Sequence, residues 1–462
     1  MRILIAGAGG FIGGRIAAEL QGAGHEVIVC GRDPGRLQRL FPYAQAIACD
    51  FAKDSAADWR ARLKTVDAVI NAAGIFRGHG ANSFEQVHIA GPAALFEACA
   101  GQRIPKLIQI SALGAGEGAG TPFHRTKAEA DERCIKLAQE HGLPSWTVVR
   151  PSLVIGQGGQ STALFAALAA LPWTPRLGDG TWQVQPIHVA DLAHAVRLLL
   201  EREGSAAPVL ELVGPAPMTT DTLTQALRRW LGLAPARAVP VPEWALRASI
   251  PLARLLSLDA LSRDSLAMLR QGNTAPVAPL AEALGWTPRE LGVALASEPS
   301  TEASLWHARL FFLRPALRIG LAIIWIWTAI VSAFVYPLDK SIAMVADLGV
   351  SGWQAAALVY GGAAVDGILG LALLFNIRPA LTGLLQLATI AVFTVLACFA
   401  VPGAWIEPLG PLTKNIAVVL ATLVMIAMEG KRCRQMPLPD CAPANIPSPW
   451  RLDTKVSTYF FC

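Results

Sequence analysis

Three glycines close to the start of the chain have the spacing of a phosphate-binding turn. The strand-like run Arg-Ile-Leu-Ile-Ala at 2–6 is followed by Gly7, Gly10 and Gly13, and then by an amphipathic stretch from Arg15. A pyrophosphate must approach bare backbone N–H groups at a helix N-terminus, where the helix dipole favours an anion, and glycine permits that approach. The pattern predicts a dinucleotide-binding turn. We expect it to contact the cofactor through Gly7, Gly9, Gly10, Phe11, Ile12 and Gly13.

The residues after the next apolar run, 26–30, indicate which dinucleotide is bound. An NAD site normally offers an acidic side chain to the ribose 2′-hydroxyl, whereas an NADP site offers a cation to the 2′-phosphate. Arg32 and Arg36 follow this run, and a guanidinium matches a phosphate in bidentate geometry. We therefore predict NADP(H) in preference to NAD. Asp33 opposes this prediction, but before Pro34 it is equally suited to be the N-cap of the next helix.

The elements that must position these residues alternate regularly along the first 215 residues. Apolar, strand-like runs lie at 2–6, 26–30, 46–49, 67–71, 106–111 and 146–150, with helical patterns at 12–22, 84–100 and 122–141. This alternation predicts an α/β fold with a doubly wound parallel sheet of the Rossmann type. We expect this domain at 1–215, a small substrate-side helical subdomain at 216–300, a membrane domain at 301–432 and a cytoplasmic tail at 433–462.

The composition is too apolar for a soluble enzyme of this length. Hydrophobic residues make up 53% of the chain, charged residues 16%, and the mean hydropathy is +0.42. The excess lies in four stretches near 317–337, 355–375, 380–400 and 414–428, most of them close to the roughly 20 residues that cross a bilayer. We predict a four-helix transmembrane bundle. The fourth stretch is short and begins at Lys414.

Basic residues beside these stretches predict their orientation, because such residues stay on the cytoplasmic side. One face would carry Arg309, Arg314, Arg318, Arg378, Lys431, Arg432 and Arg434, and the other Asp339, Lys340, Asp347 and Glu407. Both termini should then be cytoplasmic, and we expect a bacterial inner membrane. These basic residues largely explain the net charge of +5, so nucleic-acid binding is not predicted.

Neither the cysteines nor the N-terminus indicate a secreted or metal-binding protein. The eight cysteines show no CxxC or metal-type spacing, so we expect free, mostly buried thiols and no metal. The N-terminus carries one arginine and reaches the glycine turn by residue 7, without the apolar region of a signal peptide.

Six sequence blocks occur in the order found in one enzyme family. They are Gly7-x-x-Gly10-x-x-Gly13, Cys49-Asp50-Phe51, Asn71-Ala-Ala-Gly74, Thr126-Lys127, Arg150-Pro151-Ser-Leu-Val154-x-Gly156 and His188-Val-Ala-Asp191. Over about residues 1–215 the chain resembles the extended and atypical short-chain dehydrogenases/reductases. Residues 261–273 and 284–288 resemble the branch related to the NADPH-binding accessory subunit of respiratory complex I.

This resemblance implies roles for several residues. Asp50 would meet the adenine, Asn71, Ala72, Ala73 and Gly74 would line the cofactor ribose, Lys127 would bond the nicotinamide ribose, and Pro151 to Val154 would cover the nicotinamide. From the residues alone, Asn71 to Gly74 equally suits a tight turn after a strand. His188 is expected to pack or hydrogen-bond and not to catalyse.

The catalytic tyrosine of that family is missing. Its phenol donates a proton four residues before the lysine, where this chain has Phe123. The four tyrosines, Tyr43, Tyr336, Tyr360 and Tyr459, lie elsewhere. Lys127 and Ser111 remain the catalytic candidates, although many relatives carry the catalytic hydroxyl where this chain has Ala112 or Leu113. His124 is an alternative acid or base.

The apolar stretches resemble a DoxX-like membrane domain, on the evidence of four spans, Asp366 within the second and the run 407–415 before the fourth. An ionisable group inside a span is costly and faces a partner or a polar cavity. Lys414 is one candidate partner of Asp366, and neighbouring helices are the other.

Two functions follow from these features. The first is an NADP(H)-dependent oxidoreductase acting on a quinone-like or lipid-like substrate from the bilayer, which need not use the tyrosine. The second is a non-catalytic NADPH-binding module for assembly or redox sensing beside a membrane protein partner. The segment 240–271, with Trp244, Ile250 and Arg247, suits either a lid or a helix on the membrane surface.

Overall fold

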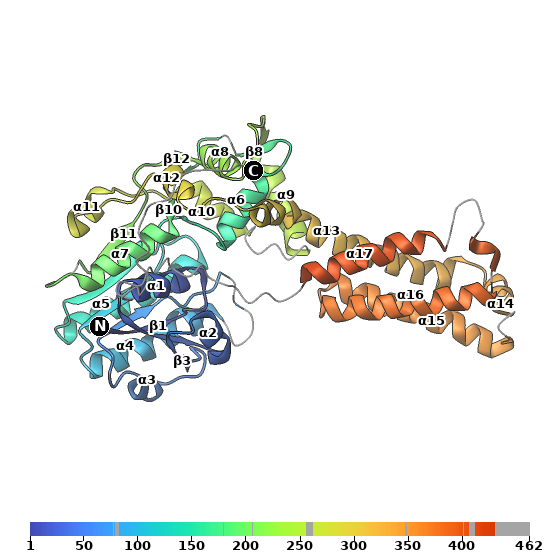
Figure 1. The fold of residues 1–462 in the computed structure, drawn as a ribbon, viewed down its shortest axis with the longest axis horizontal. Coiled ribbons are helices and arrows are strands. Elements are labelled where there is room, and N and C mark those ends of the chain that lie inside the picture. Colours follow the sequence, from blue (N-terminus) through green and yellow to red (C-terminus); the bar gives the residue numbers. More distant parts are fainter. Residues whose placement is uncertain are drawn as a thin grey trace, which may run out of the picture.

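The computed structural model describes residues 1–76, 78, 83–178, 180–205, 207–255, 262–346, 349–400, 402–405 and 412–429. These residues form a sheet domain, a smaller subdomain beside it and a helical bundle (Figure 1). The expected tail lies outside the described residues. So do Asp347, Glu407, Lys431, Arg432, Arg434, Cys433, Cys441 and Cys462.

A seven-stranded sheet is the centre of the first domain. Its strands are β1 (Arg2–Ala6), β2 (Glu26–Gly31), β3 (Gln45–Ala48), β4 (Ala68–Asn71), β5 (Lys106–Ile110), β6 (Ser145–Pro151) and β11 (Val209–Leu212). The spatial order is β3-β2-β1-β4-β5-β6-β11, and every neighbouring pair is parallel. The strand order reverses between β1 and β4, which is where such sheets open a binding crevice. The predicted doubly wound sheet is confirmed.

Helices cover both faces of this sheet, because the strands are buried on both sides. Along β1, Ile3 and Ile5 pack on one face and Leu4 and Ala6 on the other. The helices of this domain are α1 (Phe11–Gly22), α2 (Pro34–Leu40), α3 (Ala56–Arg62), the π-helix η1 (Glu85–Ala90), α4 (Gly91–Gly101), α5 (Pro122–Glu140) and α7 (Val189–Glu201). The helix expected at 84–100 is therefore two elements.

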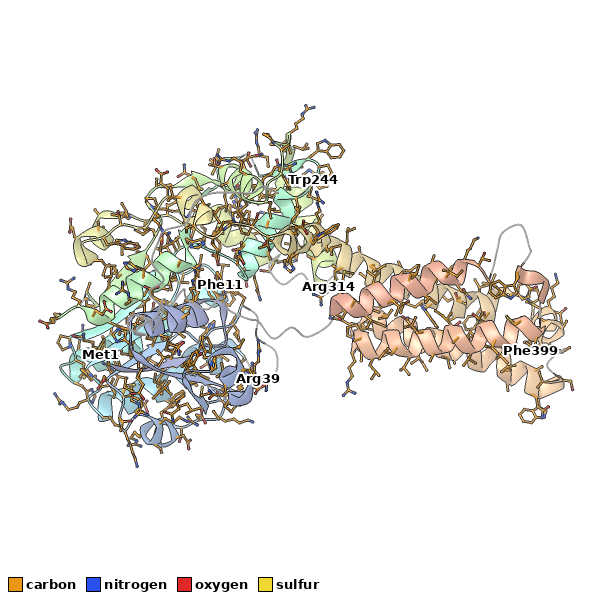
Figure 2. The ribbon with its side chains drawn as sticks, in the orientation of Figure 1. Met1, Phe11, Arg39, Trp244, Arg314 and Phe399 are labelled. Carbon is orange, nitrogen blue, oxygen red and sulfur yellow. The ribbon has the colours of Figure 1, made fainter. Side chains whose placement is uncertain are left out.

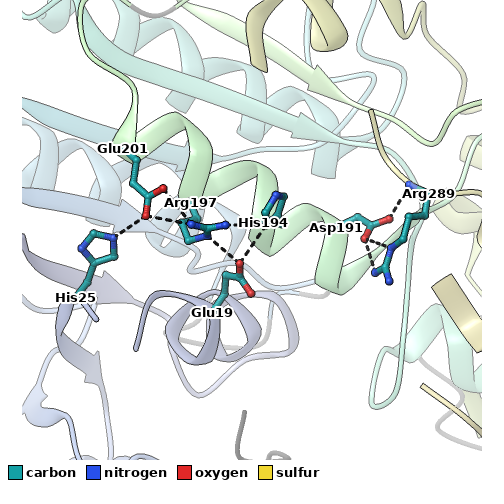
Figure 3. Close-up of polar contacts among 7 residues, drawn as sticks. All are labelled: Glu19, His25, Asp191, His194, Arg197, Glu201 and Arg289. Carbon is teal, nitrogen blue, oxygen red and sulfur yellow. Dashed lines mark hydrogen bonds and ion pairs between the residues drawn. The ribbon is translucent and has the colours of Figure 1, made fainter. Parts of the chain in front are cut away.

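Polar contacts join α7 to α1 and to the chain beyond the sheet (Figure 3). Glu19 of α1 accepts hydrogen bonds from Arg197 Nε at 3.0 Å and lies 3.2 Å from His194 Nδ1. Asp191 is 2% exposed and accepts hydrogen bonds from the Arg289 backbone N–H at 2.9 Å and from its Nε at 2.8 Å. Asp191, from the last of the six sequence blocks, therefore fixes the segment around Arg289 against the start of α7.

The subdomain combines short strands with six helices among the described residues. The strands are β7 (Val154–Ile155), β8 (Thr174–Leu177), β9 (Gln183–Val184), β10 (Ile187–His188), β12 (Met218–Thr219) and β13 (Ala238–Val241). The helices are α6 (Gln160–Ala169), α8 (Thr220–Trp230), α9 (Glu243–Leu255), α10 (Arg263–Gln271), α11 (Ala278–Leu284) and α12 (Leu291–Ala296). Most of these elements enclose a core that includes Phe165, Trp182 and Leu223, whereas α11 packs against the sheet domain.

One long helix connects the subdomain to the bundle. Helix α13 (Glu302–Ile330) begins at a Thr301 cap and continues as the π-helix η2 (Val331–Val335). Its Ala308 belongs to the subdomain core, whereas Leu321 and Ala322 belong to the bundle core (Figure 1). The span expected at 317–337 is thus the distal half of a longer helix.

The rest of the bundle consists of α14 (Leu338–Val345), α15 (Gly352–Leu374), α16 (Pro379–Ala400), the 3-10 turn η4 (Pro402–Trp405) and α17 (Lys414–Glu429). Three described helical segments are long and apolar enough to cross a membrane: Glu302–Val335, Gly352–Leu374 and Pro379–Phe399. The 16 residues of α17 extend about 24 Å, short of a hydrocarbon core of about 30 Å. Three of the four expected spans therefore have the required length.

Glycines allow close packing at two helix contacts in the bundle. A Cβ at Gly370 of α15 would lie 2.7 Å from Ile326 Cγ1 of α13. A Cβ at Gly383 of α16 would lie 2.7 Å from Ile426 Cγ1 of α17. Small residues of this kind are typical of membrane helix interfaces.

Candidate functional site

The glycine turn lies at the carboxyl end of β1 and packs against the loop that follows β4. Gly7 has φ +83°, and a Cβ there would lie 2.7 Å from the Ala73 backbone N. A Cβ at Gly13 would lie 2.4 Å from the Gly7 carbonyl oxygen. The Gly10 N–H donates to that same oxygen at 2.9 Å, and α1 begins directly afterwards. Backbone atoms and the small Ala72 methyl group line this junction, which leaves no room for a side chain at Gly7 or Gly13, as a phosphate-binding turn requires.

After the end of β2, Arg32 and Arg36 are exposed, and Asp33 between them serves as a helix cap. Asp33 caps α2, and its Oδ1 accepts a hydrogen bond from the Arg36 N–H at 2.8 Å. The N-cap interpretation of Asp33 is confirmed, which leaves the arginines as the candidate ligands of a ribose phosphate.

The amide of Asn71 supports the loop that follows β4. It is fully buried, its Nδ2 donates to Gln109 Oε1 at 2.7 Å, and its Oδ1 accepts from the Ala73 N–H at 3.2 Å. Asn71 therefore shapes the loop that contacts Gly7. Asp50, after β3, is half-buried, and its Oδ1 accepts from the Ala52 N–H at 3.1 Å.

Lys127 reaches this loop from α5. Its Nζ donates to the Ile110 carbonyl at 3.0 Å and to the Ala73 carbonyl at 3.4 Å, and a Cβ at Gly74 would lie 3.3 Å from Nζ. Burial lowers the pKa of Lys127 to about 8, against the opposing effect of Asp131. The structure thus brings Gly13, Gly7, Ala73, Gly74 and Lys127 together in one continuous set of contacts.

An aromatic cluster takes the place where the family has its proton donor. Phe123 stacks on Phe76 with ring centroids 5.0 Å apart, and it meets Phe84 and His88 edge-on. Phe123 is 8% exposed. Position 123 therefore carries an apolar ring and offers no phenol.

Two histidines adjoin this cluster, and both favour the neutral form. His88 Nε2 accepts a hydrogen bond from the Ile75 N–H at 3.1 Å, and burial, assisted by the Lys127 charge, lowers its pKa to about 3. His88 is a residue that sequence reasoning missed, because it lies on a π-helix remote from every motif. Burial also lowers the pKa of His124, whose ring packs against Gly114.

Ser111 faces a carboxylate. Its Oγ donates to Asp131 Oδ2 at 2.8 Å, and Arg150 Nε donates to the same oxygen at 3.0 Å. Asp131 is fully buried, and burial raises its pKa to about 6 although Ser111 and Arg150 act to lower it. The Ser111 hydroxyl is thus bound to the Asp131 carboxylate, which lies one helical turn after Lys127 on α5.

The segment that should cover the nicotinamide is fixed by residues that sequence reasoning did not select. Pro151 ends β6, and Val154 of β7 pairs with Ile187 of β10. The Leu153 N–H between them donates to Asn273 Oδ1 at 2.6 Å. Asn273 lies within the stretch that resembles the complex I branch, which was the available signal. His188 is 2% exposed and its Nδ1 accepts from the Ala190 N–H, so it caps α7.

Asp366 lies inside the bundle, and its Oδ1 has no hydrogen-bond partner among the residues that the structure describes. It is 5% exposed on α15, and within the described part of the chain no ion pair joins it to Lys414. At one end of the bundle, Arg314 Nη2 lies 2.7 Å from Glu429 Oε2, and Arg318 Nη1 donates to Asn376 Oδ1 at 2.7 Å. Arg318 and Asn376 thus mark the same end of α13 and α15.

A Rossmann-type dinucleotide site joined to an apolar helical bundle defines a membrane protein of the short-chain dehydrogenase/reductase type. Residues 3–210 match the NAD dependent epimerase/dehydratase family, and residues 322–423 match the DoxX-like family. The chain thus combines an NAD-dependent epimerase/dehydratase-type domain with a DoxX-like membrane domain, which confirms both expected resemblances.

Two curated relatives are similar to about half of the chain. The chain is 28% identical over 284 residues to NADH dehydrogenase [ubiquinone] 1 alpha subcomplex subunit 9 of Arabidopsis thaliana, covering 56% of this chain and 69% of that protein. It is 29% identical over 219 residues to 2-alkyl-3-oxoalkanoate reductase of Stenotrophomonas maltophilia, covering 42% and 64%.

A solved structure shares the fold. UDP-glucuronic acid 4-epimerase from Bacillus cereus, in complex with UDP-glucuronic acid and NAD, superposes with a TM-score of 0.51 at 19% identity, covering 67% of this chain and 100% of that one.

Proposed function

We propose that the crevice between β1 and β4 binds NADP(H), with the pyrophosphate on the glycine turn. Gly7, Gly9, Gly10, Phe11, Ile12 and Gly13 would form that turn. Asp50 would meet the adenine, Asn71 to Gly74 and Lys127 the riboses, and Pro151 to Val154 the nicotinamide. Exposed Arg32 and Arg36 support the 2′-phosphate, because Asp33 is engaged as a helix cap.

The nucleotide preference is tested by measuring NADPH and NADH affinities of the full-length protein. We expect NADPH to bind more tightly, and Arg32→Ala to remove the preference by weakening NADPH alone. Arg39→Ala is the matched control, because Arg39 is an exposed arginine on α2, the helix that follows Arg32, and this variant should leave both affinities unchanged. Equal affinities in the unmodified protein would refute the NADP assignment.

We further propose that the protein is an oxidoreductase for a quinone-like or lipid-like substrate. NADPH would transfer a hydride to the quinone, and a proton from water would complete the quinol, leaving NADP⁺. Lys127 would hold the nicotinamide ribose, and the apolar wall of Phe123, Phe76 and Phe84 would receive the ring. The observation that carries this proposal is the intact contact set from Gly7 to Lys127 beside an apolar wall.

The alternative is a non-catalytic NADPH-binding module for assembly or redox sensing. Phe123 favours it, since the family's proton donor is missing while the nucleotide contacts remain. The similarity to a protein named as a subunit of NADH dehydrogenase supports a membrane protein partner.

Turnover distinguishes the two functions. NADPH oxidation by the full-length protein is measured with quinones and with carbonyl compounds, for the unmodified protein, Phe123→Tyr and Phe84→Tyr. We expect quinone reduction in all three, and carbonyl reduction raised about 10²-fold or more only in Phe123→Tyr, because a positioned acid contributes about that much. Bound nucleotide without turnover in every variant would support the binding module instead.

For the membrane domain we propose four spans with both termini in the cytoplasm of a bacterium, in its inner membrane. Arg314, Arg318 and Arg378 support this orientation, because they gather at the end of the bundle nearest the nucleotide domain.

A further inference from the structure

Helix α9 of the subdomain has an outer face that no described part of the protein covers. Trp244, Arg247, Ala248 and Pro251 are exposed and recur at the spacing of one helix face. Ala253, on the opposite face, is 3% exposed. Trp244 is 73% exposed, so folding of the subdomain does not account for this side chain.

The position of this face along the molecule indicates what covers it. In Figure 2, Trp244 and Arg314 lie at about the same position along the long axis, between Met1 at one end and Phe399 at the other. Arg314 pairs with Glu429 at the near end of the bundle. Arg314 lies one helical turn before Arg318 on α13. Arg318 bonds to Asn376, which lies in the connection between α15 and α16. This end of the bundle corresponds to the headgroup layer of a bilayer that the bundle crosses.

The chemistry of the face suits that layer. Tryptophan concentrates at membrane interfaces because its ring is apolar and its N–H can remain hydrated. Glu243 of α9 pairs with Arg247 of the same helix at 2.6 Å and with Arg270 of the neighbouring helix α10 at 3.2 Å, so these two cations share one anion and this group carries a net positive charge. Helix α13 also carries an exposed tryptophan beside an arginine. The Arg309 guanidinium lies 5.9 Å from the centre of the Trp306 ring.

We propose that the outer face of α9 lies in the headgroup layer of the bilayer that the bundle spans, with Trp244 inserted and Arg247 and Arg270 toward anionic phosphates. The subdomain then touches the membrane at a second place besides α13. The inference concerns the placement of the subdomain, and it does not depend on the reaction or the nucleotide proposed above.

The test uses the full-length protein in nanodiscs made of phosphatidylcholine and phosphatidylglycerol. Trp244→p-benzoylphenylalanine is irradiated, and lipid adducts on the peptide are identified by mass spectrometry. Tyr43, 87% exposed on the sheet domain, provides the matched site for the same substitution. An unchanged circular dichroism spectrum establishes that both variants are folded.

We expect phospholipid adducts at position 244 and none at position 43. Phosphatidylglycerol should be over-represented among them relative to its share of the bilayer, and Arg247→Gln should reduce that excess. Absence of adducts at 244, or equal yields at the two positions, would overturn the proposal. Adducts that reflect only the bulk lipid ratio would overturn the part assigned to the arginines.

Discussion

At the scale of single residues, Lys127 shows how burial sets the charge at the nucleotide site. The side chain is 4% exposed, and its ammonium is held by two backbone carbonyls. Burial disfavours the charged form and lowers the pKa to about 8. The protonated Lys127 amine would attract the anionic dinucleotide. The affinity of the protein for the nucleotide should therefore depend on pH near 8.

We expect the affinity for both NADPH and NADH to fall as the pH rises through about 8, because Lys127 loses its proton there. Fluorescence titrations of bound NADPH and NADH between about pH 6.5 and 9.5 measure this. Lys127→Met should bind more weakly at pH 7 and show no such step. A step of the same size in Lys127→Met would assign the titration to another group.

From the sequence we predict contacts of residues that a single turn or helix can position. Gly7, Gly13 and Lys127 are of this kind, because a turn and one helix position them. The sequence could not predict that the Ser111 hydroxyl bonds to Asp131, or that the buried His88 lies against Phe123. Those contacts join elements that only the packed fold brings together.

At the scale of elements, the bundle contains a layer of polar side chains. Gly370 faces Ile326, Gly362 faces Phe393 and Gly383 faces Ile426 across antiparallel helix pairs. These contacts place Trp325, Asp366, Gln386 and Thr422, one from each long helix, within about one and a half helical turns of depth. Trp325 Nε1, Asp366 Oδ1 and both amide atoms of Gln386 lack hydrogen-bond partners among the described residues.

Unpartnered polar atoms inside a bilayer destabilise the element that carries them. Gln386→Leu should therefore raise the free energy of unfolding of the bundle by about 1–3 kcal/mol, measured by thermal unfolding in detergent. Thr382→Val is the control, since the Thr382 hydroxyl donates to the Ile377 carbonyl at 2.9 Å and its removal should give no gain. Destabilisation by Gln386→Leu would contradict this prediction.

Sequence and structure agree least where an element changes environment. Hydropathy detected 317–337 because lipid-facing residues are apolar, but it gave no sign that the same helix begins at Glu302. Its first turns pack on the subdomain with one face only, so their sequence is mixed. A hydropathy average reports whether a segment faces lipid or water, but it does not report where a helix begins or ends.

At the scale of the whole molecule, the two domains are too far apart for direct hydride transfer into the polar layer. The chain just before α13 lies near α1, the helix that follows the glycine turn, because Arg15 Nη1 of α1 is 3.7 Å from Glu298 Oε1. Trp325 is 23 residues beyond Glu302, or about 35 Å along the helix. Reacting atoms must come within about 3.5 Å, so a membrane-borne substrate has to reach the crevice at the bilayer surface.

The continuity of α13 also determines how such a substrate would be encountered. Because the helix is anchored in both the subdomain core and the bundle core, the crevice is held at a set height and cannot tumble freely as on a loose tether. Encounters would then follow lateral diffusion in two dimensions. The rate would depend on the number of substrate molecules per unit area of membrane, and diluting the vesicles in buffer would leave it unchanged.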